Sequence, residues 1–381
     1  MTEGLIIDCF AGGGGASEGI RQAMNREVDI AVNHDLKALM MHKMNHPSCT
    51  HVVEDIFKVR LNEYVKNRHV SLMWASPACT EYSRAKGGRP KNEQQRMLPW
   101  AVRQHAEAVR PDVIVMENVT EIQTWEDYGA FVCSMRDLGY SFESRELCAA
   151  DFGAPTIRKR WYAVLRRDGC RTEWPEQTHA RPGTLEASVM PTWVPAARHI
   201  DFSDTGTSIF GRHKPLAPAT LRRIAAGLER YVFTGKPYLV GGGAAFITQF
   251  NHNCIGQSVR EPIKTITCGA GHFGLVTAFL MSYYGNSHDA RGVDEPLPTI
   301  TTKDRFGLVL PLADESTRKL ADVRLRMLTP EELKRCQGFP CDYIIDRYSD
   351  GTRVTKTEQV AKIGNSVVPL MAKRIVAANV A

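Results

Sequence analysis

The feature that most constrains the fold is an apolar run near the start of the chain that passes directly into a cluster of glycines. Residues 5–10 have the composition of a buried strand, and residues 12–15 are all glycine. Glycine lets the backbone turn tightly and approach a ligand, and a helix starting near Ile20 would direct its first amide groups toward that ligand. The segment therefore predicts a strand, a glycine turn and a helix that bind a nucleotide-like molecule, a pattern that alone is only moderately specific.

Two further strands, expected at residues 28–32 and 52–56, also end in polar groups. The residues at and near these ends are Asn33, His34, Asp55 and Ile56. A helical stretch is expected between them, at residues 36–45. Repeated units of strand, polar tip and helix predict a doubly wound parallel sheet whose tips share one edge, where ligands bind in such folds.

A cysteine follows another apolar run, residues 70–75, which is closed by Pro77. An isolated cysteine is more often a small buried hydrophobe, but Cys79 would stand just past the carboxyl end of a strand. That position suits a nucleophile. The strand expected at residues 113–116 ends in Glu117 at the same edge, where a carboxylate could act in catalysis or simply cap the next helix.

The segment after Cys79 is rich in basic residues. These are Arg84, Lys86, Arg89, Lys91, Arg96 and Arg103. The whole chain is modestly basic, with a formal charge of +6. Such a segment can be a solvated loop, but beside a nucleophile it favours contact with phosphate groups.

Composition is ordinary for a soluble globular protein, with 43% hydrophobic and 24% charged residues in 381. This length predicts two domains. We expect a cytoplasmic protein, because no apolar run is long enough to span a bilayer and the first residues lack the features of a signal peptide. The ten cysteines show no paired spacing and are expected to be free thiols.

One group of residues has side chains of the types that bind metal ions. It comprises His42, His46, Cys49 and His51. Its spacing is loose compared with that of known zinc motifs, and we expect no metal site from the sequence.

The sequence changes in character after about Trp174, where prolines become frequent and few periodic helices are expected. We expect one domain from residues 1–177 and 322–381, and a smaller, mainly β or irregular domain at residues 178–321. The smaller domain contains an internal repeat, at about residues 258–276 and 292–309. The turns of this repeat could reach a groove or merely connect strands.

Several separate motifs resemble those of the DNA (cytosine-5)-methyltransferases, in the same order. They are residues 8–15, residues 77–79 with Ser83, residues 117–119, 158–160, 328–340 and 364–367. The resemblance covers residues 5 to about 167 and 324 to 375. It implies a Rossmann-like methyltransferase sheet, S-adenosyl-L-methionine as co-substrate, and double-stranded DNA as partner. It further implies a monomer without membrane contact, encoded by a bacterium or phage.

The chemistry of such an enzyme explains why these residue types occur together. C5 of cytosine is a poor nucleophile, so the Cys79 thiolate must first add to C6, which makes C5 able to attack a sulfonium methyl group. Glu117 would donate a proton at N3 of the base. Arg158 and Arg160 would hold the base carbonyl or a nearby phosphate. Loss of the C5 proton and elimination then free the cysteine.

The resemblance also implies the remaining site residues. Those expected to bind the methyl donor are Phe10, Ala11, Gly12, Gly14, Asn33, His34, Asp55, Ile56, Asn365 and Ser366. Those expected to bind DNA are Ser83, Arg84, Lys86, Arg89, Lys264, Lys303 and Arg305. Because the reaction cannot occur within a stacked duplex, base flipping is implied, with target recognition in the unmatched middle of the chain.

Four positions depart from the usual family pattern. Ala78 and Thr80 replace a proline and a glutamine on either side of the cysteine, which affects loop rigidity and contacts to the flipped nucleotide. Asn33 replaces a glutamate, so the ribose contact could be shared with His34 or Asp35. Thr156 replaces a glutamine ahead of the two arginines.

The sequence leaves three other functions open. An RNA cytosine-5 methyltransferase would use the same scaffold, and a catalytically silent DNA-binding scaffold would not need both Cys79 and Glu117. A dinucleotide-dependent oxidoreductase would fit the glycine turn alone. It would leave Cys79, Glu117 and Asn365 unexplained.

Overall fold

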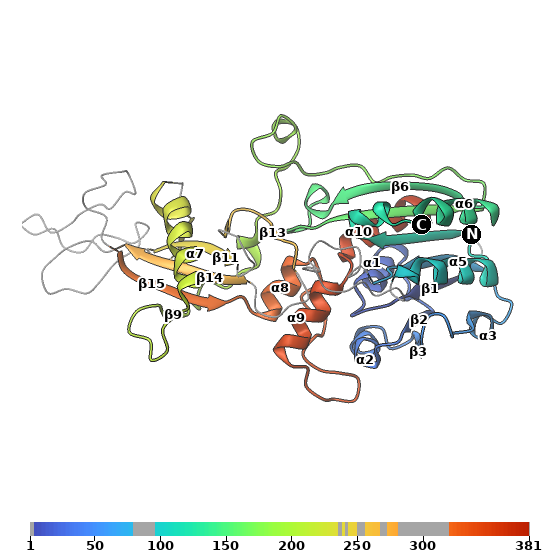
Figure 1. Cartoon of the computed structure of the whole chain (residues 1–381), viewed down its shortest axis with the longest axis horizontal. Helices are drawn as coiled ribbons and strands as arrows, with labels where there is room; N and C mark the ends of the chain where they lie inside the picture. The colour runs from blue at the N-terminus through green and yellow to red at the C-terminus, as the bar shows by residue number, and fades with distance from the viewer. Residues whose placement is uncertain are drawn as a thin grey trace, which may run out of the picture. The chain divides into compact units, whose positions relative to one another are not determined.

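The computed structural model describes residues 4–78, 96–234, 238–240, 243–249, 256–266, 273–280 and 320–380. The chain divides into two compact units (Figure 1). Unit 1 comprises Met1–Val194, Lys264–Ala270 and Leu333–Ala381, and unit 2 comprises Pro195–Ile263 and Gly271–Glu332.

Unit 1 is built on a sheet that has seven strands in the described part of the chain, in the order β3-β2-β1-β4-β5-β8-β6. In chain order these are β1 (Leu5–Cys9), β2 (Ile30–Asn33), β3 (Thr50–Val53), β4 (Val70–Ala75), β5 (Val113–Asn118), β6 (Ser141–Cys148) and β8 (Lys159–Arg166). Strands β1 to β5 are parallel. Strand β8 runs antiparallel to both β5 and β6, between which it lies.

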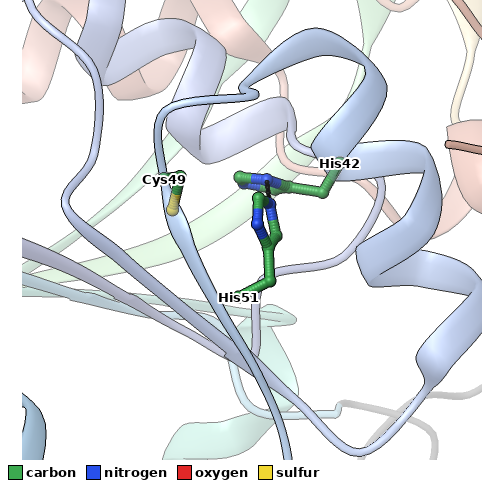
Figure 2. Close-up of side chains that lie close together, drawn as sticks. All are labelled: His42, Cys49 and His51. Carbon is green, nitrogen blue, oxygen red and sulfur yellow. Dashed lines mark hydrogen bonds between the residues drawn. The ribbon is translucent and has the colours of Figure 1, made fainter.

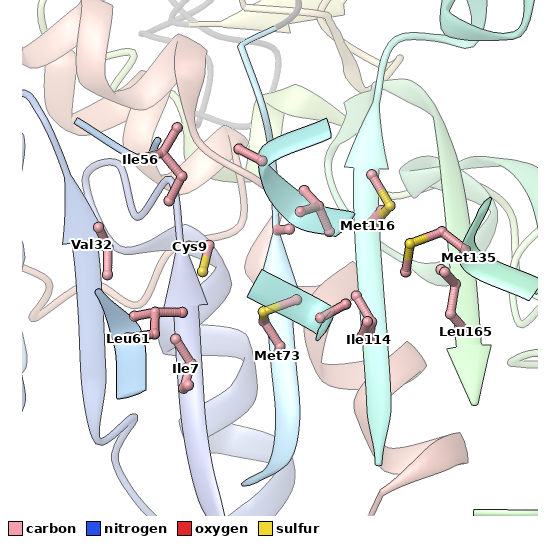
Figure 3. Packing of buried hydrophobic residues seen from close by; sticks show 14 of the residues in the cluster. Ile7, Cys9, Val32, Ile56, Leu61, Met73, Ile114, Met116, Met135 and Leu165 are labelled. Carbon is pink, nitrogen blue, oxygen red and sulfur yellow. The ribbon is translucent and has the colours of Figure 1, made fainter. Parts of the chain in front are cut away.

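Side chains of the central strands alternate between two apolar layers, one on each face of the sheet. One layer contains Ile7, Met73, Ile114 and Leu165 with Leu61, Ala101 and Met135 from helices (Figure 3). The other contains Ile6, Leu72, Val115 and Val164 with Ile20, Leu39 and Ile375 from helices. Helices therefore cover both faces, which confirms the doubly wound, Rossmann-like fold predicted from the sequence.

The helices of the first layer are α3 (Leu61–Val65), α5 (Leu98–Val109) and α6 (Tyr128–Asp137), and those of the second are α1 (Gly15–Met24), α2 (Leu36–Asn45) and α10 (Pro369–Asn379). Two further helices precede α10, namely α8 (Pro330–Cys336) and α9 (Lys356–Asn365). Short 3-10 helices are η2 (Thr120–Thr124), η3 (Ala149–Phe152), η4 (Glu186–Ser188) and η5 (Ala196–His199).

Helix α10 lies so close to α1 that two glycines of α1 have no room for a side chain. A Cβ atom on Gly15 would lie 2.2 Å from the carbonyl oxygen of Val367, and one on Gly19 would lie 2.2 Å from that of Pro369. The end of the chain is thus packed directly on its first helix, as the split domain predicted from the sequence requires.

The seven-stranded sheet has protected edges. Strand β3 is only four residues long, and β6 carries three charged side chains, those of Glu143, Arg145 and Glu146. The Trp174 ring lies against β6, where Arg145 packs over it at 5.2 Å and Glu143 accepts a hydrogen bond from its indole at 3.4 Å. Strand β6 was not predicted from the sequence.

Unit 2 contains an antiparallel sheet in the order β10-β11-β14-β15-β9. Its strands are β9 (Thr207–Ser208), β10 (Tyr238–Val240), β11 (Gly243–Gln249), β14 (Phe273–Leu280) and β15 (Leu320–Met327), with β12 (Gln257–Ser258) paired to β11. Helix α7 (Pro218–Leu228) continues as a π-helix, η6 (Glu229–Phe233). Ile224 and Leu228 of α7 pack on Phe246 and Val276 of the sheet. This helix was not predicted from the sequence.

The division of the chain differs in detail from the expected boundaries at residues 178 and 322. Residues 178–194 belong to unit 1, where the backbone amides of Thr178 and His179 donate to the Asp151 carbonyl and the Trp193 indole donates to the Asp151 carboxylate at 2.9 Å. Strand β15 belongs to unit 2 because it pairs with β14. The second copy of the internal repeat lies outside the described residues.

Within the described ranges, no helix is both long and apolar enough to cross a membrane.

The close approach of α10 makes Gly19 a sensitive position. Gly19→Ala should destabilise unit 1 by roughly 1–3 kcal/mol, as is typical of overpacking, because the added methyl group forces α10 away. Urea unfolding followed by tryptophan fluorescence measures this effect, since the six tryptophans (Trp74, Trp100, Trp125, Trp161, Trp174 and Trp193) all belong to unit 1.

Gly129→Ala is the matched control. Gly129 lies on helix α6, and a Cβ atom there would meet nothing within 4 Å. We expect that variant to be as stable as the parent or slightly more so, because alanine favours the helix. Equal losses in the two variants would show that the packing against α10 is not the cause.

Candidate active site

Four predicted motifs meet at one edge of the sheet in unit 1. Strands β1, β2, β4 and β5 are parallel neighbours, so the residues after their carboxyl ends lie side by side. These segments begin at Phe10, His34, Ser76 and Val119. Asp55 and Ile56 follow β3 at the same edge.

The glycine turn after β1 has two residues with left-handed backbone conformations. It is held by a tyrosine that is distant in sequence. Phe10 has a positive φ of 64° and Gly14 one of 94°. The Tyr343 hydroxyl donates to the Gly13 carbonyl at 2.7 Å, and it lies 2.0 Å from where a Cβ atom on Gly14 would stand. Gly14 is therefore needed for the approach of Tyr343, a residue that the sequence motifs did not single out. Gly12 instead has no atom of the described residues within 4 Å of its Cβ position.

Asn33, at the end of β2, uses its side chain to brace the neighbouring turn. Its amide group donates to the Ala11 carbonyl at 2.8 Å, and its carbonyl oxygen accepts from the Asp35 amide at 2.8 Å. His34 is exposed. Asn33 therefore has a structural role in the turn, and its residue type did not reveal this role.

The tip after β3 presents an exposed carboxylate and a buried apolar residue. Asp55 is exposed and accepts a hydrogen bond from the Phe57 amide at 2.9 Å. Ile56 is buried, and its carbonyl oxygen lies 2.7 Å from Nε2 of His105 on α5. His105 therefore steadies this tip, and no motif in the sequence pointed to it.

The C-terminal motif is bound to the same edge by contacts on both sides. Lys362 of α9 pairs with the Asp35 carboxylate at the start of α2. Although burial acts in the opposite direction, the hydrogen bond and charge of Lys362 lower the pKa of Asp35. Asn365 is exposed, whereas Ser366 is buried and its carbonyl oxygen accepts from the Gln337 amide at 3.1 Å.

The segment that leads to the predicted nucleophile is anchored by β5. The Asn118 side chain donates to the Pro77 carbonyl at 3.1 Å. Cys79 lies two residues further along, outside the described residues, as do Thr80, Ser83, Arg84, Lys86 and Arg89. Asn118 belongs to a predicted motif, but its anchoring role was not foreseen.

Glu117 and Arg160 come together beside this anchor. Glu117 is 7% exposed, and the Arg160 Nε atom lies 3.3 Å from its Oε1 atom. That oxygen is buried and takes no hydrogen bond from the residues that the structure describes. The pair forms because β8 is antiparallel to β5, so the beginning of β8 reaches the edge at which β5 ends.

Arg158 has a different contact. Its Nη1 atom donates to the Gly364 carbonyl at 3.1 Å, next to the C-terminal motif, and the side chain is 5% exposed. Thr156 is buried at the start of the same segment. The structure thus brings Arg160 to Glu117, and Arg158 to the turn that carries Asn365.

The basic residues predicted to bind DNA are only partly within the described chain. Lys303 and Arg305 lie outside it, and Lys264 is half-buried in the short strand β13 (Ile263–Lys264). Of the basic run after the cysteine, Arg96 pairs with Glu126 at 3.3 Å and Arg103 with Glu107 at 2.7 Å. These two arginines are engaged with carboxylates of unit 1.

A buried polar chain lies beneath the glycine turn. Ser17 of α1 donates to the Asp8 carboxylate at 2.7 Å, and its hydroxyl oxygen lies 2.8 Å from Nε2 of His42. Burial raises the pKa of Asp8 to about 7, although the hydrogen bonds with Ser17 act in the opposite direction. No role for Asp8 or Ser17 was predicted from the sequence.

Comparison with known proteins identifies relatives across the chain. The type II methyltransferase M1.HphI of Haemophilus parahaemolyticus is 24% identical over 388 residues, covering 97% of this chain and 84% of that protein. The type II methyltransferase M.AgeI of Thalassovita gelatinovora is 30% identical over 182 residues. That match covers 45% of this chain and 42% of M.AgeI, so it spans less than half of the relative.

Solved structures share the fold at low identity. A Dnmt2 methyltransferase from Spodoptera frugiperda superposes with a TM-score of 0.60 at 15% identity, covering 98% of both chains. Dnmt2 methyltransferase from S. pombe gives a TM-score of 0.58 at 17% identity, covering 98% of this chain and 97% of that one.

The family described as C-5 cytosine-specific DNA methylase matches residues 5–221 and 247–380. This match includes the glycine turn, Glu117, Arg160 and the C-terminal motif, and it confirms the resemblance and the enzyme class predicted from the sequence. The chain belongs to the C-5 cytosine-specific DNA methylase family.

Proposed function

We propose that the chain is a sequence-specific DNA cytosine-5 methyltransferase of a restriction-modification system. It would transfer a methyl group from S-adenosyl-L-methionine to a cytosine flipped out of double-stranded DNA. The observation that carries this proposal is the pairing of the buried Glu117 with the half-buried Arg160 beside the anchored Pro77 turn, from which Cys79 follows after two residues.

The residue types at the edge of the sheet suit the chemistry of the methyl donor. Gly12 has no described atom within 4 Å of its Cβ position, the half-buried Phe10 ring can contact an adenine, and Asp55 offers an exposed carboxylate to hydroxyl groups. When bound, S-adenosyl-L-methionine supplies an electrophilic methyl group. Ile56 and the exposed Asn365 would complete this site.

The ribose contact would fall to His34 rather than to the side chain of Asn33. Both polar groups of that side chain already bond to Ala11 and Asp35, as described above. His34 is the next residue and is exposed. An imidazole can accept a hydrogen bond from a ribose hydroxyl without carrying the charge of the glutamate usual in the family.

The chain's own residues would perform the chemistry at the base. Cys79 adds to C6 as a thiolate, and Glu117 hydrogen-bonds N3 and supplies the proton that balances this addition. Arg160, fixed beside Glu117, keeps the carboxyl group oriented and faces the same site. Arg158 would act indirectly, because it holds the Gly364 carbonyl next to Asn365. After transfer, C5 loses its proton and the cysteine leaves.

Duplex DNA is the preferred substrate because a large part of the chain lies outside the methyltransferase unit. Unit 2 supplies an antiparallel sheet and helix α7 that the reaction itself does not need. We assign target recognition to this unit, and contacts with phosphate to the basic segment after Cys79.

Labelled methyl transfer to duplex DNA and to tRNA tests the proposal directly. Bisulfite sequencing of DNA from cells that express the chain would then give the modified base and its sequence context. Methylation of tRNA alone would contradict the proposal and favour an RNA methyltransferase. Methylation of neither substrate would favour a catalytically silent DNA-binding scaffold.

Cys79→Ala should abolish methyl transfer and leave DNA binding measurable, because affinity resides mainly in phosphate and groove contacts. The parent chain should form a denaturation-resistant adduct with 5-fluorocytosine DNA, and the variant should form none. Cys133→Ala, which removes an exposed thiol of unit 1, is the matched control. Full activity in Cys79→Ala would rule out the covalent mechanism.

Glu117→Gln should lower the rate of methyl transfer by about 10²–10⁴-fold, the usual contribution of general acid catalysis, because the amide cannot supply the proton. Single-turnover kinetics measure this rate, and far-ultraviolet circular dichroism checks the fold. Glu63→Gln, the same change at an exposed position on α3, should leave the rate unchanged. Loss of the same size in both variants would contradict a role for Glu117 at the base.

A further inference from the structure

Three residues with metal-binding side chains converge between α2 and β3. They are His42 near the end of α2, Cys49 in the connection, and His51 of β3 (Figure 2). Their potential ligand atoms all lie within 4.8 Å of one another. His42 is fully buried, Cys49 is 6% exposed, and His51 is half-buried.

The hydrogen bonds of His42 leave a ring nitrogen suited to a metal. Because the Ser17 hydroxyl donates to Asp8, its oxygen can accept the proton on Nε2 of His42. The Nδ1 atom of His42 then carries a lone pair, which points at Nε2 of His51 at 2.9 Å. Histidines that bind metals commonly donate their second nitrogen to a partner of this kind, which fixes the tautomer.

His46 is excluded from the group although it lies nearby. Its ring packs on that of His42, with centroids 4.6 Å apart. However, its Nδ1 atom lies 2.7 Å from the Glu27 carboxylate and its Nε2 atom 3.4 Å from the Tyr343 hydroxyl. Both nitrogens are therefore engaged by other groups.

We propose that His42, Cys49 and His51 bind a single divalent transition metal ion of the zinc class. Two imidazole nitrogens and one thiolate are a ligand set that Zn²⁺ prefers over harder cations such as Mg²⁺. Three protein ligands leave a fourth position for water. The proposal is independent of the methyl transfer reaction, because none of the three residues belongs to the site assigned to it.

Small movements suffice to reach tetrahedral geometry. Zinc–nitrogen bonds of 2.0–2.1 Å at a tetrahedral angle place two nitrogens about 3.3 Å apart, a few tenths of an ångström more than the present separation of His42 and His51. His51 would move its proton from Nε2 to Nδ1. The Cys49 thiol donates a long hydrogen bond, 3.6 Å, to the Thr50 carbonyl, and a side-chain rotation would direct the sulfur inward.

Both acidic and basic groups lie around the three side chains. Burial raises the pKa of the Cys49 thiol, and the carboxylates of Asp29 and Glu27 act in the same direction. Asp29 is itself paired with Arg26 at 2.8 Å, and Lys43 and His46 are basic groups that act on His51. The half-buried His51 offers an entry path from solvent, whereas His42 closes the inner side.

A metal here would join parts of unit 1 that are separate in sequence. It would tie α2 to the first residues of β3 and, through Ser17 and Asp8, to the glycine turn after β1. Its expected effect is to stabilise the fold around the sheet edge, by the linkage between ion binding and folding.

Titration of the full, metal-free chain with Co²⁺ tests the proposal. We expect one ion per chain, with visible bands of tetrahedral cobalt and a near-ultraviolet charge-transfer band from the thiolate. Cys49→Ser should remove the charge-transfer band, and Ser17→Ala should weaken binding by about 10–100-fold, as expected for loss of a partner that orients a ligand.

Matched variants separate this site from other thiols and histidines. Cys133→Ser and Cys79→Ala should keep the charge-transfer band, and His69→Asn, at a histidine paired with Asp112, should keep the affinity that His51→Asn loses. No charge-transfer band in the parent chain, or a band that persists in folded Cys49→Ser, would overturn the proposal.

X-ray absorption at the metal edge of the zinc-loaded parent chain provides a test that needs no variant. One sulfur and two imidazole nitrogens around the ion would support the site. Coordination by oxygen and nitrogen alone, or by several sulfurs, would refute it.

Discussion

The arrangement of unit 1 depends on direct contact between the backbone of helix α1 and that of residues 367–369, where helix α10 begins. Carbonyl oxygens of Val367 and Pro369 occupy the space where side chains of Gly15 and Gly19 would otherwise stand. Because the helices approach this closely, residues 333–366 are carried to the carboxyl edge of the sheet. There Tyr343 can bond to the glycine turn and Lys362 to Asp35. That contact therefore produces a single surface that contains residues from both the first and the last parts of unit 1.

The direction of a single strand determines which side chains reach the part of this edge that holds Glu117. Parallel strands bring to the edge only the residues that follow them, such as Glu117 and Asn118. Strand β8 is antiparallel, so it contributes the residues at its beginning, and Arg160 meets Glu117 for that reason. The buried carboxylate of Glu117 and the guanidinium of Arg160 are thus placed together by two strands that pair directly with each other.

The sequence predicted the features that depend on local signals. Helix α2 has the expected bounds, residues 36–45, and strand β4 coincides with the apolar run at residues 70–75. Helix α7 was missed because Pro218 was interpreted as a breaker, although it occupies a first-turn position, where proline is tolerated. Strand β6 was not predicted because its sequence, SFESRELC, has few apolar residues and no sustained alternation of apolar and polar positions.

Other features depend on partners distant in sequence, and no local pattern could give them. The residue type of Asn33 suggested a ligand contact, but its partners are Ala11 and Asp35. Strand β8 is antiparallel to β5 and β6, and this direction cannot be deduced from the residues of β8 alone. The spacing of His42, Cys49 and His51 matches no metal motif, yet the packing of α2 beside β3 brings them together.

The cover over strand β6 bears on how the protein behaves at high concentration. An unpaired outer strand exposes a row of amide and carbonyl groups that can recruit the same strand of another molecule. Here Trp174 lies along that strand, held by Arg145 and Glu143, while the opposite edge offers only the four residues of β3. These features limit pairing of the sheet with another copy of the chain, and they come from residues remote from the candidate active site.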